Sequence, residues 1–137
     1  MNLKTITLLV SIFFVALSGC SKNGTTGPSG NYQEMIDDAW TSFATGNYAS
    51  SDSLFDAASK VDNTQAAAFT GRGWSNMMMD NLLTAQTHFT TASEKKNPTA
   101  NSYFGIAFCL NMQGFYGQSN EQALLGLNLD DSWQFDY

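Results

Sequence analysis

The sequence predicts an all-α protein built from three helical pairs, and two observations carry this prediction. Residues of similar type recur at an interval of 34 positions, as Trp40, Trp74 and Phe108 do. Within each interval, apolar residues follow helical spacing in two stretches with a break between them. A fixed period of this length is typical of stacked helical hairpins, in which each pair buries its apolar face against the next.

The first predicted pair covers residues 32–65. Its first helix carries an apolar stripe at helical spacing, formed by Met35, Ile36, Ala39, Trp40 and Phe43. Gly46 and Asn47 interrupt the stripe, and a second helix follows until about Asp62.

The second predicted pair covers residues 66–99, with a turn at Asp80, and the third covers residues 100–129, with a turn at Gly114. Pro98 separates the two pairs, because proline cannot continue a helix but is favoured in the first turn of the next. The predicted domain therefore runs from 32 to 129.

Residues of one type recur at matching positions of the units. A small residue stands in each first helix, at Ala39, Gly73 and Ala107. Tyr48, Leu82 and Tyr116 occupy the matching position after each turn. Phe55 and Phe89 occupy a matching position in the second helix of the first two units. These columns resemble the tetratricopeptide repeat, whose unit also has 34 residues. The resemblance implies a right-handed superhelix of antiparallel helix pairs that binds other proteins.

The chain also departs from that family's pattern. Asp38 and Arg72 stand where the family usually has leucine, and Ala123 and Gly126 replace the phenylalanine and alanine of the first two units. The third unit is therefore the least regular of the three.

The resemblance implies that the first helices of the units line a concave groove. The partner-binding positions that map there are Ile36, Trp40, Phe43, Thr70, Trp74, Met77, Met78, Phe104, Phe108 and Met112. Beside them map Gln33, Ala67, Asn101 and Asn111. A groove of aromatic and thioether side chains suits a partner segment that offers apolar anchors. The alternative is that Trp40 and Trp74 belong to the core.

Residues 1–19 have the pattern of an export signal. A basic start precedes an apolar run over 6–17 that is too short to span a bilayer. The sequence that ends it, Leu17-Ser18-Gly19-Cys20, resembles the bacterial lipobox. The resemblance implies that Cys20 becomes the first residue and carries acyl chains such as palmitate, and Ser21 indicates the outer membrane. The alternative is an ordinary secretory signal with an incidental cysteine.

The composition limits the classes of partner that the protein can bind. Residues 20–31 are rich in Gly, Ser and Thr and predict a flexible linker. The net charge of −6, with Arg72 as the single arginine, argues against nucleic acid and against electrostatic docking on anionic lipid. Cys109 lies in an apolar helical stretch and is expected to be buried.

The tail at 130–137 carries three alternating aromatic residues, Trp133, Phe135 and Tyr137, after an apolar last helix. Three explanations stay open: the tail folds back over that helix, a second copy or another protein covers it, or the sequence is a fragment of a longer array.

No catalytic constellation is evident, and no cofactor or metal is expected. His88 is expected to be a solvated surface residue. Asp52 and Asp56 lie one helical turn apart and would hold a cation only weakly without a third ligand. A hydrolase or carbohydrate-binding accessory would need Asp62 to join them in one cleft.

We therefore expect a non-enzymatic, lipid-anchored scaffold at the bacterial cell envelope. It would bind a protein or peptide partner on the groove and contact the membrane through its N-terminal lipid. The alternative is a structural subunit of an envelope complex or homo-oligomer, in which the same aromatic residues are buried.

Overall fold

The computed structural model describes residues 31–134, which form six α-helices. In chain order these are α1 (Tyr32–Ala44), α2 (Tyr48–Val61), α3 (Ala66–Met78), α4 (Leu82–Ser93), α5 (Ala100–Met112) and α6 (Tyr116–Leu129). The prediction of an all-α chain is confirmed for this part. The predicted signal peptide, Cys20 and nearly all of the linker lie outside the described residues, as do the last three residues of the tail.

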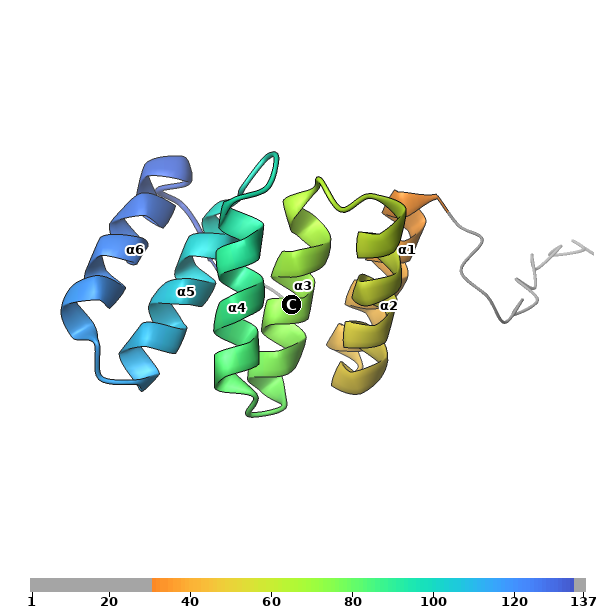
Figure 1. Ribbon diagram of the computed structural model, residues 1–137, viewed down its shortest axis with the longest axis horizontal. Coiled ribbons are helices and arrows are strands. Elements are labelled where there is room, and N and C mark those ends of the chain that lie inside the picture. The colour runs from red at the N-terminus through yellow and green to blue at the C-terminus, as the bar shows by residue number, and fades with distance from the viewer. Residues whose placement is uncertain (1–30, 135–137) are drawn as a thin grey trace, which may run out of the picture.

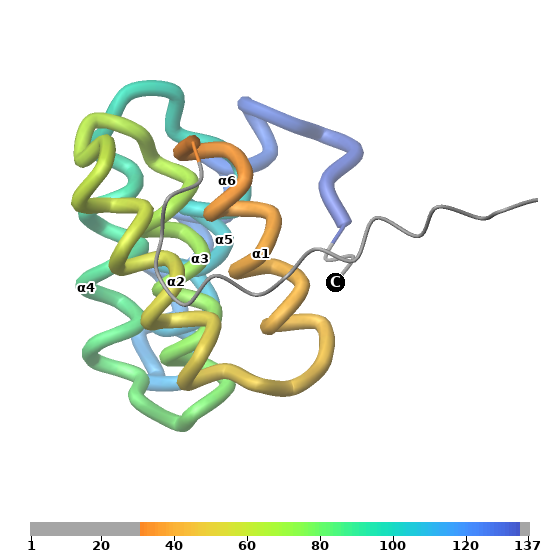
Figure 2. The backbone as a smooth tube through the Cα atoms, turned by 90° about the vertical axis from the view of Figure 1, so that its right-hand side faces the viewer, coloured from red at the N-terminus to blue at the C-terminus, as the bar shows by residue number. Residues whose placement is uncertain are grey.

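The helices stand side by side in a row, and each packs against the next in the chain (Figure 1). Helix α3 also contacts both α1 and α5. Helices α2, α4 and α6 make no contacts with one another within the described range. Figure 2 shows α2 and α4 together on one side of this row. The helices therefore form two layers, and the layer of α1, α3 and α5 is the more closely spaced.

The three turns inside the pairs share one backbone geometry. A left-handed residue occupies the same register in each, with φ of 79° at Gly46, 61° at Asp80 and 84° at Gly114. The next amide donates across each turn at 2.9 Å, from Asn47 to Ser42 O, from Asn81 to Asn76 O and from Phe115 to Leu110 O. The 34-residue period of the sequence is therefore also a period of the backbone.

The loops between the pairs lie beside each other. The amide of Lys96 donates to Thr64 O at 2.9 Å, and the amide of Ala66 donates to Lys96 O at 3.3 Å. These bonds form an isolated parallel bridge between Gln65 and Lys96. They fix the starts of α3 and α5 relative to each other.

Phenylalanine rings and glycines hold the pairs together. Phe55 and Phe89 are fully buried. The ring of Phe55 lies against Gly71, and the ring of Phe89 lies against Gly73 and Gly105, so closely that a Cβ at any of these glycines would overlap a ring. Phe89 of α4 therefore contacts both α3 and α5.

The two ends of the row differ in character. At the α1 end, Asp37 occupies the register of Gly71 and Gly105, and it is exposed together with Glu34 and Asp38. At the α6 end, four leucines are 44–60% exposed, namely Leu124, Leu125, Leu127 and Leu129. Asp37 therefore places a charged side chain at the register where α3 and α5 have the glycine that contacts a phenylalanine of the preceding helix.

Candidate functional site

The structure separates the ten predicted groove residues into three groups. Ile36, Phe43, Thr70 and Trp74 are buried. Trp40, Met77 and Phe104 are half-buried. Met78, Phe108 and Met112 are exposed, at 47%, 44% and 65%. The surface that a partner can reach is therefore smaller than the predicted groove, and we call these three exposed side chains the inner patch.

The tryptophans belong largely to the core, as one of the two interpretations predicted. Trp74 makes edge contacts with Phe89 and Phe108, with ring centres 5.0 and 6.0 Å apart. Trp40 makes similar contacts with Phe43 and Phe55. Aromatic pairs at such distances favour edge-to-face arrangements, which lock the rings in place.

Thr70 is occupied by contacts within the protein. Its hydroxyl lies 3.0 Å from that of Ser102 and 3.1 Å from the carbonyl oxygen of Ala66. Both hydroxyls are buried between α3 and α5. A buried, hydrogen-bonded hydroxyl is not available to a partner, so Thr70 positions the two helices instead.

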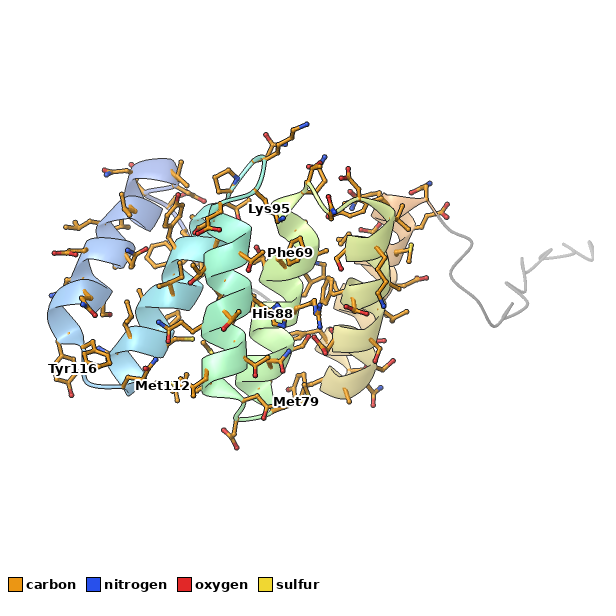
Figure 3. All side chains as sticks on the ribbon, in the orientation of Figure 1. Phe69, Met79, His88, Lys95, Met112 and Tyr116 are labelled. Atoms are coloured by element: carbon orange, nitrogen blue, oxygen red, sulfur yellow. The ribbon has the colours of Figure 1, made fainter. Side chains whose placement is uncertain are left out.

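The inner patch belongs to the layer of α1, α3 and α5. Met78 ends α3, and Phe108 and Met112 lie one turn apart on α5. Met112, Met79 and Tyr116 all lie along the lower edge of the row in Figure 3, near the turns inside the pairs. The patch is apolar and contains two flexible thioethers, which suit contacts with a partner of variable shape.

The tail contributes a residue that sequence reasoning did not assign to this surface. The indole of Trp133 stacks on Phe104, with ring centres 4.1 Å apart and planes 21° apart, and Phe108 lies 6.4 Å away. Its Nε1 donates to Asn101 Oδ1 at 2.5 Å. We call Asn101, Phe104 and Phe108 the indole cradle.

The described part of the tail folds back, but onto α5 and not over the last helix as the first of the three explanations has it. Beyond α6 the chain crosses to the side of the α1–α3–α5 layer that faces away from α2 and α4 (Figure 2). The exposed leucines of α6 stay uncovered in the described chain. The three alternating aromatics were the only sequence signal for this contact.

The acidic residues of α2 pair with arginine. Arg72 Nε lies 3.1 Å from Asp52 Oδ1, and its Nη1 lies 2.7 Å from Asp56 Oδ1. The pKa of Asp56 is lowered, first by a hydrogen bond from Lys60 and further by the charge of Arg72. The guanidinium therefore takes the place that the weakly held cation would have had.

Asp62 does not join these carboxylates. It accepts hydrogen bonds from the amide and the hydroxyl of Thr64, and these bonds lower its pKa. Within residues 31–134, no group of three or more His, Cys, Asp and Glu side chains could hold a metal ion. The cleft that a hydrolase would need is not formed by these three aspartates.

His88 and Cys109 are both more enclosed than ordinary surface residues. His88, midway along α4 (Figure 3), is half-buried rather than solvated, and burial lowers its pKa, with Arg72 adding to the effect. Cys109 is buried, as expected, and burial raises the pKa of its thiol to about 11. A thiol of that pKa is a poor nucleophile.

No family model matches the chain, and comparison with curated proteins found no match.

None of the helices that the structure describes has the length and apolar character needed to cross a membrane. A shallow, open depression on α4, lined by Leu83 and polar residues such as Gln86, Thr87 and Thr90, lies on the other layer and holds no charged group.

Proposed function

We propose that this protein is a lipid-anchored scaffold of tetratricopeptide type at the bacterial cell envelope, which binds a protein segment on its inner patch. The observation that carries the proposal is the exposure of Met78, Phe108 and Met112 together on the layer of first helices. Exposed apolar side chains that gather on one face are typical of protein interaction sites.

A right-handed superhelix is part of this proposal. The close contacts among α1, α3 and α5, together with their absence among α2, α4 and α6 in the described residues, support a row that curves toward the first helices. The repeated turn geometry supports equal rotation from pair to pair. Such curvature would make the inner patch the floor of a concave surface.

The chemistry of the patch indicates the partner's chemistry. It presents one aromatic ring and two thioethers and no charged side chain. A partner would gain most by inserting leucine-like or aromatic anchors, and the protein's net charge of −6 would disfavour an acidic one.

Affinity capture from solubilised envelopes tests the proposal. The tagged full chain is compared with a variant carrying Met78→Glu and Met112→Glu, which places charges on the inner patch. Leu83→Glu is the matched control, because Leu83 is an exposed leucine of α4 on the other layer. We expect the patch variant to lose a partner that the native chain and the control retain. Equal capture by all three would contradict the proposal.

The lipid anchor needs its own experiment. A cell grown with a labelled fatty acid should incorporate the label into the native chain and not into a Cys20→Ser variant. Two or more acyl chains hold a protein stably on a bilayer, so the variant should also leave the membrane fraction. Label on the Cys20→Ser variant would contradict acylation at this cysteine.

A structural subunit is the second candidate, and α6 favours it. Its exposed leucines form an apolar end that the described chain leaves uncovered. Light scattering of the full chain in detergent over a range of concentrations distinguishes the two functions. Assembly that Leu124→Glu abolishes would favour the subunit, whereas a monomer at all concentrations would exclude self-assembly.

A further inference from the structure

The indole cradle fits a tryptophan side chain in three ways. Phe104 presents a ring face at stacking distance, Phe108 flanks the indole, and Asn101 Oδ1 accepts a hydrogen bond from Nε1. Phenylalanine and leucine lack that donor, and tyrosine carries its donor at the end of the ring. Asn101 is half-buried, so a side chain that covers its Oδ1 without donating a hydrogen bond would lose affinity, and the cradle therefore favours indole.

The cradle occurs once among the described units. In the second unit, Ala67 and Thr70 occupy the registers of Asn101 and Phe104, and Thr70 is already bonded to Ser102. In the first unit, Gln33 donates to Asp37 at 2.9 Å and Ile36 is buried. Neither unit combines an acceptor with an accessible ring face.

The resident indole is held by a short, polar connection. Helix α6 ends where the amide of Asp130 donates to Gly126 O. Asp130 Oδ1 then accepts from the amide and the hydroxyl of Ser132, at 3.0 and 2.8 Å, which turns the chain back toward α5. Asp130, Asp131 and Ser132 are exposed, so Trp133 is the side chain of this connection that gains from packing.

We propose that the indole cradle is a binding subsite for a tryptophan of the partner segment, and that Trp133 is its built-in competitor. The subsite adjoins the inner patch, because Phe108 belongs to both. A partner that anchors on the patch and carries a tryptophan must displace the tail. This inference rests on the proposed function for the partner, and the cradle's own selectivity is tested without one.

A tethered competitor is strong because its effective concentration is high. A short linker holds a group near its site at an effective concentration of the order of millimolar. A free tryptophan peptide would therefore bind the native chain weakly and a chain without Trp133 much better. The tail would restrict the subsite to partners that also use the inner patch.

The test uses a fluorescent peptide with the sequence of residues 129–134 and measures anisotropy with the full chain in detergent. W133A should bind the peptide about tenfold or more tightly than the native chain does. In the W133A background, N101A should weaken binding about tenfold, since it removes the acceptor for Nε1. A peptide with alanine in place of tryptophan should not bind. L124A is the control, because it alters exposed α6 and leaves the cradle filled.

Equal binding by W133A and the native chain would overturn the inference, as would equal binding of the tryptophan and alanine peptides. If W133A does not fold, N101A in the native chain answers the question. Its loss of the Nε1 bond should expose the indole of Trp133 and shift that proton's NMR resonance toward its solvent position. An unchanged resonance would count against the cradle.

The two proposals can fail separately. Peptide binding to W133A with no partner captured on the inner patch would remove the proposed function and keep the cradle. A captured partner whose binding is unaffected by N101A and W133A would keep the function and remove the cradle.

Discussion

The ring of Phe89 lies against Gly105 of the next helical pair, in a space that a single Cβ would fill. The same ring touches Gly73 of its own pair. The close approach of α3, α4 and α5 therefore depends on the absence of a side chain at Gly73 and Gly105, and substitution of these glycines tests this.

Gly105→Ala should destabilise the fold. Alanine normally stabilises a helix interior by about 0.5–1 kcal/mol relative to glycine, but here the methyl group would overlap Phe89 and cost about 1–3 kcal/mol. Denaturant unfolding measures the change. Gly117→Ala is the matched control, because nothing lies within 4 Å of a Cβ there, and it should stabilise. Equal effects of the two changes would contradict the packing.

Asp80→Gly should raise the free energy of unfolding. Asp80 has φ of 61°, at the register where the other two turns have glycine. A left-handed backbone costs most residues about 1–2 kcal/mol, so relief at Asp80 should gain about 0.5–1 kcal/mol after the entropy of glycine is counted. Gly46→Ala, at the equivalent turn, should act in the opposite direction. A loss of stability in Asp80→Gly would count against a common turn geometry.

His88 should make stability depend on pH. Burial and Arg72 disfavour the imidazolium, so the folded state has a pKa below 6.5 and the unfolded chain binds the proton more readily. Stability therefore falls as the pH drops below about 6.5. His88→Gln should flatten the free energy of unfolding between about pH 7.5 and about pH 5.5. Asp56 and Asp62 have lowered pKa values and contribute only at more acidic pH.

Cys109 should resist thiol reagents in the folded protein. Its pKa of about 11 leaves almost no thiolate near neutral pH, and the side chain is fully buried. With Cys20 changed to Ser, Cys109 is the only cysteine, so a chromogenic disulfide reports on it alone. The Cys109 thiol should react only after denaturant has unfolded the protein. Rapid reaction in native buffer would contradict its burial.

The helices were predictable because their signals are local and periodic. The breaks at Gly46, Asp80 and Gly114 recur with the apolar stripes and have a simple backbone cause. The burial of Trp74 was left open by the sequence. Arg72, in the register of the family's leucine, pairs with carboxylates of α2, while Trp74 fills the core against Phe89.

The cradle could not be predicted, because it joins residues far apart in the chain. Trp133 and Asn101 are 32 positions apart and meet only after α5 and α6 have packed. His88 was predicted to be a solvated surface residue, whereas it is half-buried, because other helices pack around it. Local patterns carry little information on contacts of this kind.

A photo-crosslinking residue in place of Met112 tests the central claim most directly. In intact envelopes, it should capture one protein from the inner patch, and the same residue in place of Leu83 on α4 should not. Crosslinking of that protein from position 83 and not from position 112 would contradict the account.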